Sequence, residues 1–279
     1  MSIFERTDIL IGGDGRRALE EAEVAIYGLG GVGAACAMDL VRIGVGHFYV
    51  VDFDLVEESN LNRLYFGYLS TVGAAKADVF AKFARDINPA IEIEAKKRFF
   101  SGEEAASIVD DKAAYHADCI DSLNAKVSLL EELCRRDARF IASMGTAGRL
   151  HPERLRLGSI WETRGCPLAK SVRTGLRRRG VTADFPAVWS DEVPVKPVDP
   201  GCLRGRNCGA ATSRDEQGEQ AGDGDTRASR QTSPQASPPP GRLRMVQGSG
   251  PFVPQAAGHI IASWITRQIL EQAGRPQNA

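Results

Sequence analysis

The chain has 279 residues, which suits one large α/β domain with a small appendage, because single cores stop growing near roughly 250 to 300 residues. Its 35 Lys and Arg against 36 Asp and Glu give a net charge of −1, which excludes nucleic-acid binding through bulk charge. Six cysteines spread along the chain without a secretory leader argue against a disulfide scaffold. We therefore expect a cytoplasmic protein.

The first predicted elements are a strand, a glycine turn and a helix. Residues 14–17 predict a turn into a short surface helix, and the apolar run 24–27 predicts a strand. Glycines at 28, 30 and 33 follow, and residues 34–43 have helical composition. Residues 47–51 predict a second strand, which ends at Asp52, about 20 residues beyond the last glycine, as in a dinucleotide-type βαβ unit.

Strands and helices continue to alternate along the chain. Helices are predicted at 74–86, before Asn88 and Pro89, and at 124–136. Strands are predicted at 91–95, 117–121 and 140–145. This order predicts an α/β fold, a doubly wound and mostly parallel sheet with helices on both faces and a Rossmann-like nucleotide-binding half.

Composition divides the chain into three predicted parts. Residues 1–200 form the nucleotide-binding domain, residues 201–242 an insert, and residues 243–272 a C-terminal segment that packs back on the core. Large apolar residues are scarce from about 205 to 242, so the insert is expected to be disordered. Polar residues interrupt the apolar stretch 252–270, which predicts a buried helix and no membrane span.

The glycine turn predicts a phosphate site. Gly28, Gly30 and Gly33 allow a tight turn and close backbone approach, so that phosphates meet amides at a helix N-terminus. This signal is weak alone, because a plain glycine turn would also explain it. The glycines and Asp52 taken alone favour NAD binding, with Asp52 on the ribose.

Later residues favour phosphate chemistry without hydride transfer. The loop Ser59-Asn60-Leu61-Asn62-Arg63 follows the second strand, and Lys76 follows Arg63 by 13 residues. Arg63 and Lys76 can neutralise charge on the α- and β-phosphates of ATP, and Asp121 can hold magnesium. The alternative is that both cations are solvated and that Asp121 caps the helix after it.

These motifs resemble the ubiquitin-activating-like (ThiF/MoeB-type) adenylating superfamily. The resemblance implies that Asp52 binds the ribose, that Asn60, Arg63 and Lys76 contact phosphates, and that Asp121 lies on the magnesium side. It also implies that Arg6 enters the ATP site of a second copy, and hence a homodimer. The implied catalytic residues are Arg6, Arg63, Lys76 and Asp121, with Asp121 as metal ligand, and the implied nucleotide-binding residues are Gly28, Gly30, Gly31, Gly33, Asp52, Asp54, Ser59, Asn60, Asn62, Arg63, Lys76, Asp121 and Ser122.

Four further segments narrow the resemblance. Residues 86–89, 117–122 and 166–173, together with 248–270, look like the tRNA threonylcarbamoyladenosine dehydratases. That family implies ATP and magnesium as cofactors, tRNA as substrate partner, and adenylation of a threonyl carboxylate that then cyclises. Proximity favours the ring closure, so no enzyme thiol is needed.

Cysteines and basic residues leave some questions open. The chain has no CxxC pair, and Cys202 and Cys208 lack a metal-like ligand spacing, so we interpret them as free thiols. Cys166 is expected in a loop near the active edge, without a catalytic role. A basic run on a predicted helix suits either a phosphate backbone or water: Lys170, Arg173, Arg177, Arg178 and Arg179, preceded by Arg149, Arg154 and Arg156.

Four alternatives stay open at this point. They are adenylation of a sulfur-carrier protein, adenylation of a ubiquitin-like modifier, NAD-dependent redox chemistry, and a degenerate nucleotide-binding scaffold. The sulfur-carrier reaction leads among them, and a sulfur-relay or carrier protein would then be a partner. The Ser59–Arg63 loop and Lys76 argue against the redox and scaffold alternatives.

Overall fold

The computed structural model describes residues 3–99, 104–198 and 247–274. Its strands are β1 (Glu23–Tyr27), β2 (His47–Val51), β3 (Glu92–Lys96), β4 (Tyr115–Asp118), β5 (Phe140–Ser143), β6 (Leu155–Ser159) and β7 (Pro186–Ser190). Its α-helices are α1 (Glu5–Glu21), α2 (Gly31–Ile43), α3 (Lys76–Ile87), α4 (Ala105–Ile108), α5 (Leu123–Arg135), α6 (Pro167–Arg178) and α8 (Phe252–Gln272). Short 3₁₀ turns lie at Glu58–Asn60, Leu69–Thr71, Pro152–Arg154 and Ile160–Glu162.

The strands form one seven-stranded sheet in the order β3-β2-β1-β4-β5-β7-β6. All neighbouring pairs run parallel except β6 and β7, which are antiparallel. The chain builds outward from β1 to β3 and then returns to place β4 on the other side of β1. The predicted doubly wound, mostly parallel sheet is confirmed, and the switch between β1 and β4 is where such folds bind ligands.

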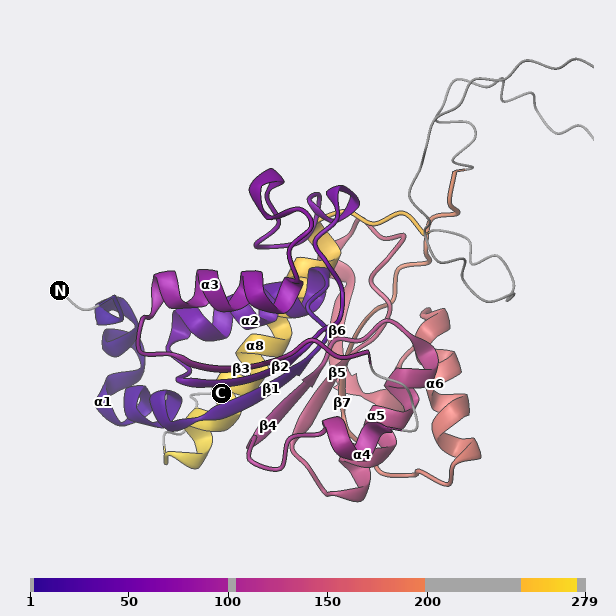
Figure 1. Cartoon of the computed structure of the whole chain (residues 1–279). Helices are drawn as coiled ribbons and strands as arrows, with labels where there is room; N and C mark the ends of the chain where they lie inside the picture. The colour runs from indigo at the N-terminus through magenta and orange to yellow at the C-terminus, as the bar shows by residue number, and fades with distance from the viewer. Residues whose placement is uncertain (1–2, 100–103, 199–246, 275–279) are drawn as a thin grey trace, which may run out of the picture. The chain divides into compact units, whose positions relative to one another are not determined.

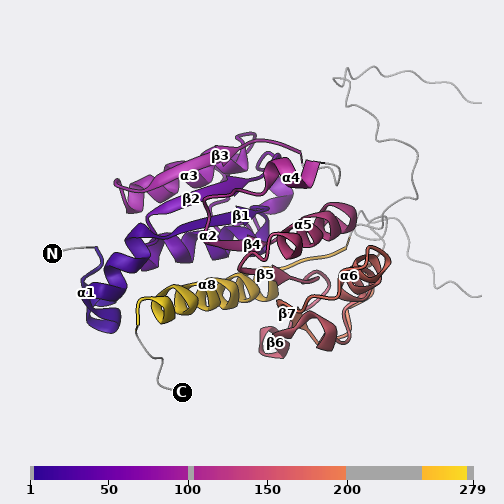
Figure 2. The ribbon, with the colours of Figure 1, turned by 90° about the horizontal axis from the view of Figure 1, so that it is seen from below.

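Helices cover both faces of the sheet, as the alternating pattern predicted (Figure 1). One core cluster joins side chains of α1, α2, α3 and α8 to one face, and a second joins α4, α5 and α6 to the other. Figure 2 shows the same two groups of helices from below, with the sheet between them. Both faces are therefore buried, which explains the fully buried strands β4 and β5.

The predicted strand at 117–121 is wrong in its boundaries. Strand β4 ends at Asp118, so Asp121 lies in the loop before α5 and not at the end of the strand. The amide of Cys119 still donates to the carbonyl of Tyr27 at 2.9 Å, whereas the next amide, that of Ile120, donates to the Asp118 carboxylate at 3.1 Å. The site side chain is therefore carried by a loop.

The predicted turn at 14–17 is also wrong. These residues lie inside α1, and the break in the helix occurs earlier, at Gly12, where φ is 72°. Glycine adopts that angle without strain, so the two helical parts continue on either side of a kink. Two strands were not predicted: β6 is half exposed, and β7 begins with a proline.

Helix α8 brings the C-terminal part of the chain back to the first βαβ unit, and the expected buried helix is confirmed. A Cβ added to Gly258 would lie 2.4 Å from the carbonyl oxygen of Val32, so only glycine lets α8 approach α2 this closely. The segment before α8 is joined to the core at Gly148. The amide of Gly148 donates to the carbonyl of Gly248 at 2.8 Å, and the carbonyl of Gly148 accepts from the amide of Val195 at 2.7 Å.

Residues 1–195 and 248–279 form one compact unit, apart from residues 196–247. The predicted low-complexity insert and its boundaries at 200 and 242 fall within 199–246, outside the described residues. Among the described helices, none is long and apolar enough to cross a membrane.

A buried histidine on β4 is expected to make folding pH-dependent. His116 contacts the Tyr27 hydroxyl at 3.1 Å, and burial lowers its pKa from 6.5 to about 4. Below pH 6.5 the unfolded chain takes up a proton that the folded chain does not, so stability falls as pH falls toward 4 and is unaffected above 6.5. We expect this group to cost about 3 kcal/mol at about pH 4.

Urea unfolding of the wild type and of His116→Phe at about pH 7 and pH 4 measures this cost, because the variant cannot take up the proton. The wild type should lose about 3 kcal/mol more than the variant between the two pH values. Equal losses would show that His116 does not carry the dependence.

Candidate nucleotide-binding site

The glycine turn between β1 and α2 has little space for side chains. Gly28 has φ of 91°, and a Cβ there would lie 3.0 Å from the carbonyl oxygen of Cys119. A Cβ on Gly33 would lie 1.8 Å from the carbonyl oxygen of Gly28, so the turn cannot close around a larger residue. A Cβ added to Gly30 would meet no atom within 4 Å. The turn thus packs tightly against β4 and leaves an open side at the N-terminus of α2, where anions bind well.

Asp52 joins the end of β2 to this turn. Its Oδ2 accepts from the amide of Leu29 at 2.6 Å, and its Oδ1 accepts from the amide of Asp54 at 2.8 Å. Burial raises the pKa of this carboxyl, while the nearby Lys76 ammonium and the two amides lower it. Each oxygen keeps a lone pair, so Asp52 can still accept a hydrogen bond from a ribose hydroxyl.

Lys76 is the first residue of α3 and lies against Asp54. Its Nζ is 2.7 Å from Asp54 Oδ2, and its amide donates to the Asp54 carbonyl at 3.0 Å. The lysine is buried, whereas the Asp54 side chain is 46% exposed. The alternative that Lys76 is solvated is therefore wrong, because Asp54 holds its ammonium within the structure beside Asp52.

The predicted loop from Ser59 to Arg63 contacts the glycine turn through its arginine. A Cβ on Gly31 would lie 3.4 Å from Arg63 Cγ, so the stem of the arginine packs on the start of α2. Arg63 Nη1 donates to the carbonyl of Ser59 at 2.8 Å and to Asn62 Oδ1 at 2.9 Å. The side-chain Nδ2 of Asn60 donates within the same loop, to Ser59 Oγ at 3.3 Å.

Asp121 and Ser122 lie between β4 and α5. Asp121 is exposed, and its carboxylate makes no hydrogen bond or ion pair with any other described residue. Ser122 occupies the N-cap position of α5 without a side-chain capping bond, so Asp121 does not cap this helix either. The loop reaches the glycine turn through Cys119, whose carbonyl faces Gly28.

A buried ion pair under this loop was not predicted. Lys126 Nζ lies 2.5 Å from Asp118 Oδ2, and both side chains are 0% exposed. Burial raises the pKa of Asp118, and Lys126 opposes that rise. The pair fixes the end of β4 to the first turns of α5, on either side of Asp121. The sequence contains no signal for it, because acidic and basic residues eight positions apart share no regular periodicity.

The donor set fits magnesium only with help from a nucleotide. No cluster of three or more His, Cys, Asp or Glu side chains arranged for a metal occurs among residues 3–99, 104–198 and 247–274. Magnesium is commonly held by one or two carboxylates together with substrate phosphates and water, and the unpaired, exposed Asp121 carboxylate suits that role.

The three arginines before α6 are bonded within the protein, which argues against the phosphate-binding alternative for this part of the basic run. Arg149 is buried and donates from Nε to the carbonyl of Glu192 at 3.1 Å. Arg154 and Arg156 both pair with Asp191, at 2.7 and 3.3 Å. These arginines fold the loop onto itself and do not form a free cationic surface.

Some basic residues of the run on α6 have no ion-pair partner among the described residues and are available to bind an anion. Arg173 donates to Thr163, and Arg179 pairs with Glu131 at 2.7 Å. Arg177 lies over the ring of Trp161, 4.9 Å from its centroid. The remaining cations of the run, Lys170 and Arg178, are exposed and have no ion-pair partner in the described part of the chain.

None of the four cysteines that the structure describes is marked out as a reactive thiol. Cys36 and Cys119 have pKa values raised by burial, the second to about 12. Cys166 is buried at the N-cap of α6, with Sγ 4.0 Å from the carbonyl oxygen of Gly145. Cys202 and Cys208 lie outside the described residues.

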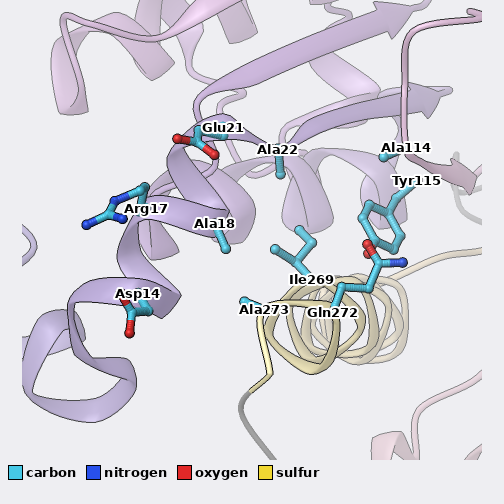
Figure 3. A pocket seen from close by; sticks show the side chains of 10 residues that line it. All are labelled: Asp14, Arg17, Ala18, Glu21, Ala22, Ala114, Tyr115, Ile269, Gln272 and Ala273. Atoms are coloured by element: carbon cyan, nitrogen blue, oxygen red, sulfur yellow. The ribbon is translucent and has the colours of Figure 1, made fainter.

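Arg6 is not brought to this site by its own chain. It is exposed in the first turn of α1, whose Ile9 and Leu10 are 78% and 72% exposed. The hollow in Figure 3 also lies elsewhere, because Ala22 and Ala114 in its lining precede β1 and β4 at the amino ends of the strands. Among the expected site residues, the structure therefore joins the glycine turn, Asp52, Asp54, Lys76 and the Ser59–Arg63 loop.

Comparison with known families and proteins gives consistent matches. A model described as the ThiF family matches residues 5–152. A tRNA threonylcarbamoyladenosine dehydratase of Bacillus subtilis (strain 168) is 38% identical over 192 residues, which are 69% of this chain and 76% of that protein. Molybdopterin-synthase adenylyltransferase of Escherichia coli (strain K12) is 34% identical over only 42% of this chain and 46% of its own length.

Longer relatives and solved structures extend the comparison. tRNA threonylcarbamoyladenosine dehydratase 2 of Saccharomyces cerevisiae is 34% identical over 66% of this chain, which spans 42% of that protein. The solved structure of E. coli tRNA N6-threonylcarbamoyladenosine dehydratase in complex with ATP matches 98% of this chain and 96% of its own, with a TM-score of 0.75 and 23% identity. At that identity the likeness establishes the fold.

Proposed function

Because this chain belongs to the ThiF family, we propose that it uses ATP to activate the threonyl carboxylate of threonylcarbamoyladenosine in tRNA and then closes that group into a ring. The observation that carries the proposal is the network at the carboxyl ends of β1 and β2. There Asp52, Asp54 and Lys76 are bonded to one another and to the glycine turn, beside Arg63. The Bacillus subtilis dehydratase matches 69% of this chain, whereas molybdopterin-synthase adenylyltransferase matches 42%.

The glycine turn and Asp52 would position ATP. The amides at the start of α2 would face the phosphates, whose charge the N-terminus of a helix favours. Asp52 is fixed by two backbone amides and would accept from the ribose. The adenosine would then lie on the β2 side of the switch between β1 and β4, with the α-phosphate above the turn.

In the first step a carboxylate oxygen of the substrate attacks the α-phosphorus, and the bond to the leaving pyrophosphate breaks. Negative charge grows on the leaving group, where Arg63 and Lys76 would stabilise it. Lys76 is held by Asp54 before ATP binds, so its ammonium is already placed and has two further N–H donors for phosphate. Bound magnesium would supply charge neutralisation between the phosphates, held to the chain by Asp121.

In the second step the nitrogen or oxygen of the neighbouring carbamoyl group attacks the activated carbonyl carbon, the carbon–oxygen bond to AMP breaks, and a carbamoyl N–H proton passes to solvent. One substrate oxygen leaves with AMP, so the net change in the nucleoside is loss of one water. The attacking group is part of the same substrate, so this step needs positioning and no covalent enzyme intermediate.

The exposed cations of α6 support tRNA as the partner, and α1 supports a homodimer. Lys170 and Arg178 are unpaired in the described structure, and Arg177 stacks on Trp161, an arrangement that suits a phosphate backbone beside unstacked bases. The exposed Ile9 and Leu10 beside Arg6 suit contact with a second copy. Sedimentation would distinguish that dimer from the 30.1 kDa monomer. A cytoplasmic location fits both partners.

The test is release of AMP and pyrophosphate from ATP by the purified full chain, with tRNA that carries or lacks threonylcarbamoyladenosine, followed by nucleoside mass spectrometry. The proposal expects AMP release that depends on the modified tRNA, with loss of one water from that nucleoside. Adenylation of the C-terminus of a sulfur-carrier or ubiquitin-like protein is the alternative. Pyrophosphate exchange with a small carrier protein and silence with tRNA would establish it instead.

A further inference from the structure

A short segment from the C-terminal part of the sequence contacts the loop from Ser59 to Arg63. We call residues 248–255, which include the first turn of α8, the strap. Its first residue, Gly248, accepts a hydrogen bond from Gly148 in the loop after β5, and its last residue, Gln255, is bonded to the loop after β2. Figure 1 shows the start of α8 beside the loops that follow β2. The strap therefore connects the two halves of the sheet along their carboxyl edge.

The amide of Asn62 lies between the strap and Arg63. Its Nδ2 donates to the carbonyl of Ser249 at 2.7 Å, and its Oδ1 accepts from Arg63 Nη1 at 2.9 Å. A carboxamide offers a donor and an acceptor on one rigid group, so it can serve both partners at once. Both of its ends are thus occupied by the protein itself.

The strap also holds the backbone and the stem of the arginine. Gln255 Nε2 donates to the carbonyl of Arg63 at 3.3 Å. A Cβ on Gly31 would lie 3.0 Å from Pro254 Cβ and 3.4 Å from Arg63 Cγ, so the strap, the arginine and the start of α2 pack together. The far end of the strap cannot shift, because Gly258 brings α8 onto the backbone of α2.

These contacts fix one edge of the guanidinium and leave the other available. Nη1 is occupied by Ser59 and Asn62, while Nε and Nη2 make no hydrogen bond within the described residues. The Nε and Nη2 edge is the pair of parallel donors that binds a phosphate or carboxylate in two-point fashion. Rotation of the side chain would lose that alignment.

We propose that Asn62 is a positioning residue that ties Arg63 to the strap, so that the C-terminal part of the chain sets the orientation of the phosphate-binding guanidinium. The proposal rests on the proposed function only for the identity of the reaction. Asn62 acts through Arg63 and does not itself contact the nucleotide. The orientation of Arg63 is therefore set both by its own loop and by the strap, whose Ser249 lies 187 residues after Asn62 in the sequence.

A double-mutant cycle tests this role, with ATP affinity measured by calorimetry and AMP formation measured with modified tRNA. Asn62→Ala should weaken ATP binding about threefold and lower kcat about tenfold, the range of one or two hydrogen bonds to a charged group. In the Arg63→Ala background the same change should alter neither quantity more than about twofold. Equal losses in both backgrounds would mean that Asn62 acts on the nucleotide directly and would overturn the proposal.

Gln255→Leu tests the strap independently, with Gln268→Leu as its matched control on the same helix. Among the described residues the Gln268 side chain bonds only to Glu271, so its variant should stay within about twofold of the wild type. Gln255→Leu should lower kcat and should lose its effect when Arg63 is alanine. Unchanged kcat in Gln255→Leu would contradict a role for the strap. If the wild type binds ATP but does not modify tRNA, the affinity cycle still decides the role of Asn62.

Discussion

Asp121→Ala is expected to lower AMP formation at least about a thousandfold while leaving the fold intact. The Asp121 carboxylate is exposed and makes no bond to other described residues, so its loss removes no contact that stabilises the chain. The same feature leaves both oxygens free for magnesium and phosphate chemistry. AMP release with modified tRNA and the thermal unfolding midpoint measure the two halves of this expectation.

Asp14→Ala is the matched control for Asp121→Ala. Asp14 is another exposed aspartate, but it lines the hollow at the amino ends of the strands, away from the nucleotide site (Figure 3). It should retain full activity. AMP release by Asp121→Ala at more than a few per cent of the wild-type rate would remove Asp121 from its assigned role, whatever the midpoint shows.

Lys126→Met is expected to destabilise the chain by about 3 to 5 kcal/mol, because it leaves the fully buried Asp118 without its counter-ion. The methionine fills a similar volume, so the loss reports the charge and not a cavity. Denaturant unfolding at about pH 7 measures it. Lys112→Met, at an exposed lysine, should change stability by no more than about 0.5 kcal/mol.

A second variant separates the charge from the packing. Asp118→Leu with Lys126→Met should recover most of the lost stability, because apolar side chains of similar volume often replace a buried pair at little cost. The recovered chain should still fall short of the wild type, since the amide of Ile120 loses its acceptor. A loss below about 1 kcal/mol in Lys126→Met alone would show that Asp118 does not stay charged when buried.

The sequence predicted the parts of the fold in which local pattern and burial agree. Strand β1, the glycine turn and α2 follow from an apolar run, three glycines and an unbroken helical stretch, and the structure confirms them. Strands β6 and β7 were missed, because one carries exposed side chains on an edge and the other begins with a proline. The helix through Gly12 was missed, because glycine usually ends a helix, and here it only bends one.

Local motifs also indicated much of the candidate site. Asp52 and Lys76 lie where their positions after a strand and at a helix start predicted. The contacts that fix them were not predictable, because they depend on partners from distant elements. Asn62 meets Ser249, and Gln255 meets Arg63, only because α8 returns along α2, and no short-range pattern records that return.

Gly148 contacts both the residue where the chain leaves the core, Val195, and the residue where it re-enters the core, Gly248. Val195 bonds to its carbonyl and Gly248 to its amide, so the frame of the core is closed there whatever passes between them. A longer connection would cost little, since each doubling of loop length costs about 0.6 kcal/mol. This junction is thus a suitable place for insertions. A fluorescent or affinity domain inserted between residues 196 and 247 should leave the contacts between the strap and Arg63 unchanged.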